Sequence, residues 1–308
     1  MKQKQTEKVF LPENKEEDLV YWVATDMHYL ADELYDNGSV FQQLLLTNDG
    51  KLIERGTDII EEFISQAIHE KPDGVLICGD LTFNGERISL MKIAEQFDKL
   101  EEEGIPVYVI PGNHDLDYAF SDYYLGDEHG KVPNISLEAF KEIAGKFGYS
   151  DALAKEESSF SYVAELKDDI WLMALDVNSS AVKGCLSKDT LEWMEEQLQS
   201  AKSKNIKVIT MSHQNVLKQN DMMYAEYGVF LNLSGHSHLQ HTSRSDSFTD
   251  ICTESLSVYP LQFGILTLHA DQNSFDYENR ELGIYKEEAR ERFDETVIRM
   301  VEPQLQGL

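Results

Sequence analysis

The segment TDIIEEFISQAIHEKPDGVLICGD, residues 57–80, contains the unit from which the fold is inferred. Its first part has the apolar spacing of an amphipathic helix, with Ile59, Ile60, Phe63, Ile64, Ala67 and Ile68 on one face. A Pro-Asp-Gly sequence then ends the helix, and residues 74–78 form an apolar run typical of a buried strand. Gly79-Asp80 follows this run directly. The segment therefore predicts a helix that leads into a buried strand with a carboxylate at its carboxyl end.

The same alternation of patterns continues on both sides of this segment. An apolar run at residues 20–24 precedes it, and a helical pattern at 88–103 with another apolar run at 107–110 follows it. Strands that alternate with helices favour right-handed βαβ units and a parallel sheet. We therefore expect an α/β fold.

The rest of the chain is expected to belong to the same domain. Residues 116–133 are polar and rich in tyrosine, and we expect them to form a long connection. Further helices are expected at 136–147, 188–202 and 286–300, and strands at 159–166, 170–177, 208–211, 229–233, 248–253, 264–268 and 274–277. Because the composition does not change along the chain, we expect a polar leader at 1–18 and a single domain at 19–308 that ends in a helix.

Composition and charge exclude several classes of protein. The chain has 308 residues, and its 42% hydrophobic content is enough to bury a core. No apolar run approaches the roughly 18–20 residues that span a bilayer. The net charge of −29 argues against extended contact with nucleic acid or an anionic membrane. A site that handles phosphate in such a chain needs concentrated positive charge, which a metal ion can supply.

The compartment stays open at this point. Residues 1–18 lack the apolar stretch of a signal peptide, so we expect a soluble chain that is either cytoplasmic or exported after removal of a signal. The three cysteines, Cys78, Cys185 and Cys252, fit neither a disulfide framework nor a zinc-finger spacing.

Metal-ligating side chains follow five of the predicted strands. They are Asp26-Met27-His28, Gly79-Asp80, Gly112-Asn113-His114-Asp115, Ser212-His213 and Gly235-His236-Ser237-His238. In open α/β sheets ligands bind at the carboxyl ends of the strands, so we expect these side chains to converge there. Any one group alone occurs by chance, but the complete set in this order does not.

This ordered set resembles the calcineurin-like metallophosphoesterase superfamily, whose pattern runs D-x-H, G-D, G-N-H-[DE], H and G-H-x-H. Every block of the pattern is present between residues 26 and 238. The resemblance implies a four-layer α/β/β/α sandwich, in which two mixed sheets are flanked by helices. It also implies a hydrolase that uses two metal ions.

The resemblance also implies which residues bind the metals. Asp80 is expected to bridge the two ions. Asp26, His28 and His238 complete one site, and Asn113, His213 and His236 complete the other. Mixed nitrogen and oxygen ligands suit Zn, Fe or Mn better than Mg or Ca. We therefore expect two divalent or trivalent ions of these metals, without a choice among them.

A water held between two such ions has its pKa lowered towards about 7, which provides hydroxide near neutral pH. No Ser or Cys is paired with a base, so we expect this hydroxide to attack the phosphorus. By resemblance, His114 stabilises the transferring phosphoryl group or protonates the leaving oxygen. Asp115 is expected to orient the His114 ring.

Departures from related families narrow the expected reaction. Residues 79–85 and 111–115 lack the arginines of phosphoprotein phosphatases, and Phe83 stands where purple acid phosphatases have a tyrosine ligand. The Gly-Asp-Leu-Thr-x-x-Gly sequence is similar to that of the bacterial phosphodiesterase branch, which includes class III cyclic nucleotide phosphodiesterases. A diester carries a single negative charge and needs less cationic grip than a monoester. We therefore expect hydrolysis of a cyclic nucleotide or a similar small diester.

Two alternatives stay open: a phosphomonoesterase of broad specificity, and a non-catalytic metal-binding protein of the same fold. A nuclease is disfavoured by the charge. Asn84, Tyr118 and Tyr124 are candidates for contact with the substrate, because an aromatic face can stack on a base or ring. Packing within the protein would explain the tyrosines equally well.

Overall fold

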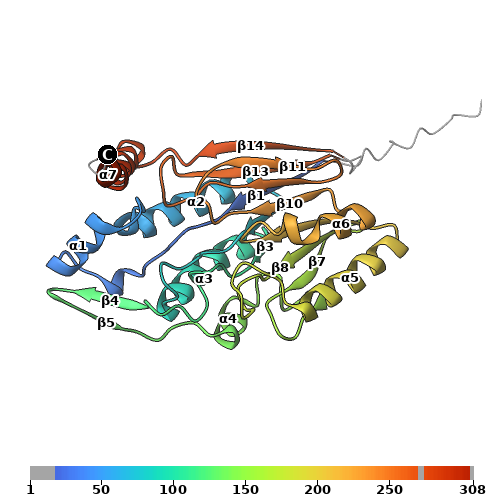
Figure 1. Cartoon of the computed structure of the whole chain (residues 1–308), viewed down its shortest axis with the longest axis horizontal. Coiled ribbons are helices and arrows are strands. Elements are labelled where there is room, and N and C mark those ends of the chain that lie inside the picture. The colour runs from blue at the N-terminus through green and yellow to red at the C-terminus, as the bar shows by residue number, and fades with distance from the viewer. Residues whose placement is uncertain (1–17, 270–273, 306–308) are drawn as a thin grey trace, which may run out of the picture.

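The computed structural model describes residues 18–269 and 274–305, so the leader expected at 1–18 lies almost wholly outside the described residues. The described strands form a five-stranded sheet, a seven-stranded sheet and a separate hairpin. In Figure 1, strands run through the middle of the molecule and along its upper edge, and helices lie to the left of them and below them.

The five-stranded sheet contains the unit predicted from residues 57–80. Its strands, in the spatial order β14–β13–β1–β2–β3, are β14 (Phe275–Glu281), β13 (Gln262–Leu268), β1 (Leu19–Ala24), β2 (Gly74–Ile77) and β3 (Val107–Val109). β1, β2 and β3 are parallel, whereas β13 and β14 are antiparallel to their neighbours. The carboxyl ends of the three parallel strands therefore meet at one edge.

The seven-stranded sheet is also mixed. Its strands, in the spatial order β11–β12–β10–β9–β8–β7–β6, are β11 (His241–Arg244), β12 (Thr249–Cys252), β10 (Leu231–Ser234), β9 (Lys207–Ser212), β8 (Ile170–Leu175), β7 (Tyr162–Lys167) and β6 (Ala154–Lys155). β8, β9, β10 and β12 are parallel, so their carboxyl ends also share an edge.

The described helices are α1 (Ser39–Thr47), α2 (Gly56–Glu70), α3 (Arg87–Glu102), α4 (Leu137–Ala144), α5 (Lys188–Ser203), α6 (Leu217–Tyr227) and α7 (Lys286–Leu305). The apolar face predicted for α2 is buried, and its Phe63 packs on Trp22 of β1 at 5.7 Å between ring centroids. α7 lies beside the start of α2, where Arg292 pairs with Glu54 (Figure 1).

Alternate residues of β8 show how the layers are stacked. Ile170, Leu172 and Ala174 belong to the core between the two sheets. Trp171, Met173 and Leu175 face the other way and pack in a second core with α5. The Tyr162 hydroxyl of β7 also donates to the Val109 carbonyl of β3, 3.0 Å away, which joins the two sheets. The predicted mixed α/β sandwich is confirmed.

Four elements were not predicted, and one connection is more regular than expected. Within residues 116–133, β4 (Asp122–Leu125) and β5 (Glu128–Lys131) form a hairpin. The four elements that were not predicted are α1, α6, β6 and β11. β6 has only two residues, β11 consists of polar and charged residues, and polar residues are interspersed among the apolar ones of α6. Their conformations depend on the tertiary structure more than on a local apolar pattern.

Candidate metal centre

Five loops bring the seven expected ligands to the carboxyl edges of the two sheets. The loops follow β1, β2 and β3 in one sheet and β9 and β10 in the other. The ligands on these loops are Asp26, His28, Asp80, Asn113, His213, His236 and His238. Side chains separated by up to 212 residues, those of Asp26 and His238, therefore approach one another.

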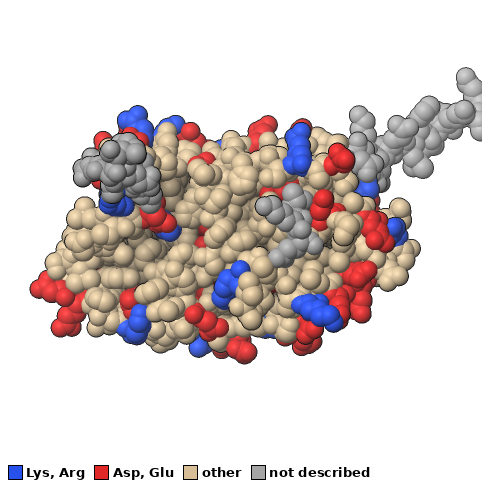
Figure 2. Space-filling view, viewed as in Figure 1, with Lys and Arg blue, Asp and Glu red and all other residues tan. Residues whose placement is uncertain are grey.

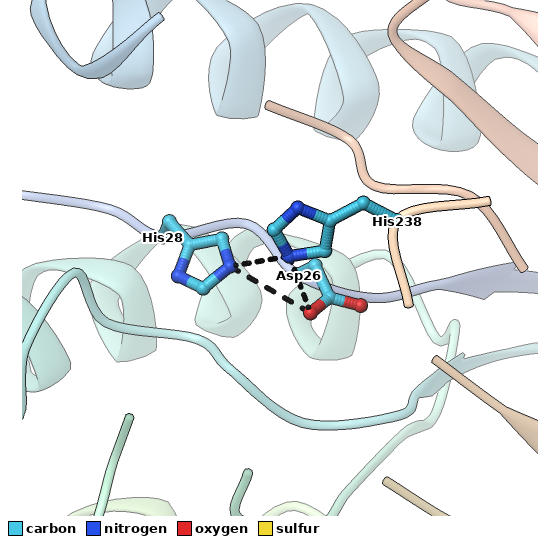
Figure 3. A group of neighbouring side chains, drawn as sticks. All are labelled: Asp26, His28 and His238. Atoms are coloured by element: carbon cyan, nitrogen blue, oxygen red, sulfur yellow. Dashed lines mark hydrogen bonds and ion pairs between the residues drawn. The ribbon is translucent and has the colours of Figure 1, made fainter. Parts of the chain in front are cut away.

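Asp26, His28 and His238 form the first group of expected ligands, and Figure 3 shows their side chains pointing toward one another. The Nε2 atoms of His28 and His238 are 3.0 Å apart. Asp26 Oδ1 lies 3.1 Å from the His238 nitrogen and 3.6 Å from the His28 nitrogen. One carboxylate oxygen and two ring nitrogens thus face a common point.

Asp80 lies between this group and a second one. Its Oδ2 atom is 3.8 Å from His28 Nε2 and 3.2 Å from His213 Nε2. In the second group, His213 Nε2 is 3.1 Å from Asn113 Oδ1, and the His213 and His236 ring centroids are 5.2 Å apart. Asp80 is therefore the carboxylate that contacts both groups.

Two neighbours fix the second group in this orientation. His213 Nδ1 lies 2.7 Å from the Cys78 carbonyl, which can only accept, so Nδ1 carries the proton and Nε2 faces the site. Gln214 donates from Nε2 to Asn113 Oδ1 at 3.0 Å. Sequence reasoning identified neither supporting contact, because each depends on chain segments that are distant in sequence.

Five of the ligands have a left-handed backbone. The φ angles are 52° for Asp26, 45° for His28, 51° for Asp80, 71° for His236 and 53° for His238. Ten non-glycine residues in the described part of the chain have a positive φ, so these ligands make up half of them. This conformation is unfavourable for L-residues, and it persists where a functional arrangement requires it.

Two glycines of the motif are explained by close approach to the carboxylates. A Cβ atom on Gly112 would collide with the Asp80 side chain. A Cβ atom on Gly235 would collide with Thr25 and Asp26. Only glycine allows these loops to pass so near the ligands.

The electrostatics of the site keep the two carboxylates ionised. Burial opposes ionisation, but the histidines around Asp26 and Asp80 hold the pKa of each carboxyl well below its usual value. Burial, followed by the charge of Lys51, lowers the pKa of His28 to about 3. Burial by itself would lower the pKa of His213. The negative charge of Asp80 outweighs burial and raises the pKa of His213 to about 9. The site is a buried concentration of anionic oxygens and imidazoles.

These residues suit metal ions on the evidence of their own contacts. Asp26 Oδ1 is buried and accepts no hydrogen bond. The two facing Nε2 atoms of His28 and His238 can share only one proton between them. A cation between these atoms would engage both nitrogens and the carboxylate oxygen at once. The mixed nitrogen and oxygen donors fit Zn, Fe or Mn.

The expected role of Asp115 is wrong. Its carboxylate accepts from the N–H groups of Leu81, Thr82 and Gly112 at 2.8–3.1 Å and from the Thr82 hydroxyl at 2.7 Å. It makes no hydrogen bond with His114, whose Nδ1 lies 2.9 Å from the Phe83 carbonyl instead. Asp115 is buried, and it holds the loop after β2 against the loop after β3.

The three candidate substrate contacts lie in different surroundings. Tyr118 is partly exposed and stacks on the His114 ring at 4.7 Å. Asn84 has its Oδ1 atom 3.0 Å from His114 Nδ1. Tyr124 is buried and lies 6.5 Å from the Phe41 ring, within the hydrophobic core. Of the two tyrosines, Tyr118 is therefore the one beside the site.

Lys51 is a neighbour of the site that sequence reasoning missed. Its side chain is buried, and its ammonium lies 2.7 Å from both carboxylate oxygens of Asp49. The next residue, Leu52, donates to the carbonyl of Ser257, whose hydroxyl donates to the Asp26 carbonyl. The only sign of burial in the sequence was that apolar residues follow Lys51. Because a lysine side chain is ordinarily exposed, its burial was not expected.

The surface agrees with the acidic composition. On the part of the face in Figure 2 that the structure describes, basic side chains are isolated and acidic ones are scattered around them. Among the described residues, no helix combines the length and the apolar character needed to cross a bilayer.

The comparisons with known proteins agree with this geometry. The family model of the calcineurin-like phosphoesterases matches residues 19–240. The chain has no match among curated proteins. A dimetal phosphatase from Danio rerio is similar in structure, with a TM-score of 0.60 and 13% identity over 86% of this chain and 97% of that chain. GAP50, the anchor in the inner membrane complex of Plasmodium, has a TM-score of 0.52 and 14% identity over 91% of this chain and 95% of that chain. At these identities the two structures show a shared fold.

Proposed function

Because this chain belongs to the calcineurin-like phosphoesterase family, we propose that it hydrolyses phosphodiesters with two bound metal ions. The proposed substrate is a cyclic nucleotide or a similar small diester, as in the bacterial phosphodiesterase branch that the Asp80 loop resembles. The Danio rerio protein of similar fold is described as a dimetal phosphatase, which supports the use of two ions.

The position of Asp80 carries this proposal. Its Oδ2 atom is within 4 Å of both His28 and His213, one from each group of ligands. In the proposed centre, the ligands of one ion are Asp26, His28, Asp80 and His238, and those of the other are Asp80, Asn113, His213 and His236. When bound, such a pair acts as Lewis acids on the phosphoryl oxygens and makes water nucleophilic at neutral pH.

His114 is the proposed proton donor to the leaving oxygen. Its backbone N–H donates to Asp80 Oδ1 at 2.8 Å, which ties the residue to the centre. Ligand atoms of His28, Asp80 and His114 lie within 4.8 Å of one another. Since Nδ1 is engaged by the loop after β2, Nε2 is the atom available to a substrate.

The proposed preference for a diester over a monoester rests on the small number of uncompensated cations near the site. The segments 79–85 and 111–115, which contain Asp80 and His114, have no arginine. Lys51, the buried cation near His28, is compensated by Asp49. A singly charged diester requires less compensation than a doubly charged monoester, so it suits a site with few free cations.

The test compares two substrates that have the same leaving group. The chain is stripped of metal, reloaded with Mn, and assayed on bis(p-nitrophenyl) phosphate and on p-nitrophenyl phosphate. We expect faster turnover of the diester, and we expect elemental analysis to find two metal ions per chain. A screen of cyclic nucleotides and linear diesters then identifies the preferred class.

Other results would overturn particular parts of the proposal. Faster turnover of the monoester would make the chain a phosphomonoesterase. Two bound ions without turnover of any ester would make it a metal-binding protein of the same fold. Full activity of His114→Ala would remove His114 from the proposed chemistry.

A further inference from the structure

The His114 ring is held by contacts on several sides. Tyr118 stacks on one face with an angle of 24° between the rings, and the His28 ring lies edge-on at 4.9 Å. The backbone of His114 is fixed by its hydrogen bond to Asp80 Oδ1. The ring therefore has little freedom to rotate away from the metal ligands.

The hydrogen bonds of Nδ1 determine which nitrogen carries the proton. Nδ1 lies 2.9 Å from the carbonyl oxygen of Phe83 and 3.0 Å from Asn84 Oδ1. A backbone carbonyl can only accept, so this contact favours a proton on Nδ1. The side-chain oxygen of Asn84 then accepts the same proton. Nε2, on the opposite side of the ring, has no proton in the neutral form, so His114 can donate to a leaving oxygen only after Nε2 has taken up a second proton.

Asn84 is itself firmly anchored. Asn84 is buried, with only 9% of the residue exposed. Its backbone N–H donates to Glu86 Oε2 at 3.0 Å, and its carbonyl accepts from the Ser121 hydroxyl at 2.6 Å. The side-chain oxygen is therefore presented to His114 from a rigid loop, which is a different task from contacting a substrate.

We propose that Asn84 is a positioning residue, which acts with the Phe83 carbonyl to keep the proton of His114 on Nδ1 and to direct Nε2 toward the metal ligands. The loop after β2 thus performs the task that Asp115 was expected to perform. Both acceptors are uncharged amide oxygens, so they fix the tautomer without adding a negative charge beside Asp80 and Asp26. This role rests on the proposed function only for its effect on catalysis, because the tautomer itself is independent of any reaction.

The first test reads the tautomer directly. Long-range ¹H–¹⁵N NMR spectra distinguish an Nδ1–H from an Nε2–H imidazole, and the spectrum of His114→Gln assigns the signal. We expect His114 to be the Nδ1–H tautomer in the wild type and to show a mixture of tautomers in Asn84→Leu. An unchanged Nδ1–H signal in Asn84→Leu would overturn the inference, even if the protein hydrolysed no phosphoester.

The second test reads catalysis in the metal-loaded protein. Because supporting contacts of this kind are worth about 10–100-fold, we expect Asn84→Leu to lower kcat by that factor with KM within about twofold. The loss should be larger for diphenyl phosphate than for bis(p-nitrophenyl) phosphate, since the poorer leaving group depends more on the proton from His114. Asn84→Asp keeps an acceptor oxygen and should recover most of the loss.

Ser121→Ala is the matched structural control. It removes a buried hydrogen bond from the same loop but leaves both acceptors of His114 in place. We expect a smaller loss of kcat than in Asn84→Leu, because one anchor of the loop is removed, and a leaving-group dependence that matches the wild type. An equal loss in Ser121→Ala and Asn84→Leu would mean that general loosening of the loop is responsible, and it would contradict a specific role for Asn84.

Discussion

Two pairs of buried carboxyl groups occupy neighbouring loops of the metal centre, yet their surroundings differ. Asp26 and Asp80 face imidazole rings, which hold their pKa below the usual value despite burial. Asp115 and Glu86 are bound by backbone N–H groups, and burial raises the pKa of both, that of Glu86 to about 8. Buried carboxyl groups on adjacent loops therefore differ: the pKa is lowered for Asp26 and Asp80 and raised for Asp115 and Glu86.

The difference lies in what each carboxyl group can still bind. Asp26 Oδ1 is buried without a hydrogen-bond donor, and Asp80 Oδ2 faces histidine nitrogens that a cation could engage together with it. The oxygens of Asp115 are already occupied by four donors, which leaves it a structural task. Burial alone does not identify a metal ligand; the partners of the carboxylate do.

Asp80→Asn should produce the largest effect. The substitution replaces the oxygen near both groups of ligands by an N–H₂ group, which cannot bind a cation. We expect both ions to be lost in elemental analysis, and activity to fall on the order of 10³-fold. Circular dichroism should show an intact fold. If the variant retained two ions, Asp80 would not be a metal ligand. The contrast between Asp26 and Asp80 on one side and Asp115 and Glu86 on the other would then fail.

Asp115→Asn is the matched substitution in the structural pair. With its N–H₂ group turned toward Thr82, the amide can donate to the Thr82 hydroxyl, and its oxygen still accepts from Leu81 and Gly112. The Thr82 N–H then loses its acceptor, and one buried donor without a partner costs about 1–3 kcal/mol of unfolding free energy, which urea denaturation can measure. The folded fraction should still bind metal. A loss of metal at unchanged stability would instead place Asp115 among the ligands.

The fold could be predicted from the sequence where apolar patterns were strong. The helix within 57–70 and the strands after it occur within a residue or two of their predicted positions, because each buries a continuous apolar face. α6 and β11 were not predicted, because Tyr224 of α6 is buried in the same core as Met173 of β8 and Val208 of β9, and β11 pairs with β12. Local sequence carries little information about such elements.

The seven expected ligands follow a known pattern in their order along the chain, and the structure places them near one another. Their binding of metal stays a prediction. Their supporting contacts could not be predicted. The Phe83 carbonyl on His114 and the Cys78 carbonyl on His213 are backbone groups, which every residue has. Lys51 resembles any surface lysine until the burial of its ammonium is known. Such contacts depend on the three-dimensional path of the loops.

Glu86→Gln should have the smallest effect, and its sign depends on pH. Burial raises the pKa of Glu86 from 4.5 to about 8, so between these values the folded chain holds a proton that the unfolded chain has released. Stability therefore decreases as pH rises through this range, with a limiting slope of about 1.4 kcal/mol per pH unit. Glutamine keeps an acceptor oxygen for the Asn84 N–H and does not titrate.

The difference in stability between Glu86→Gln and the wild type isolates this group, because all other titrations cancel. Urea denaturation of metal-stripped protein should give a difference that shifts in favour of the variant by up to about 2.5 kcal/mol from pH 5.5 to pH 7.5. A difference that stays constant would mean that Glu86 ionises normally in the folded chain. Glu86 would then resemble Asp26 and Asp80 in being held ionised, and the contrast between the two pairs of carboxyl groups would rest on Asp115 alone.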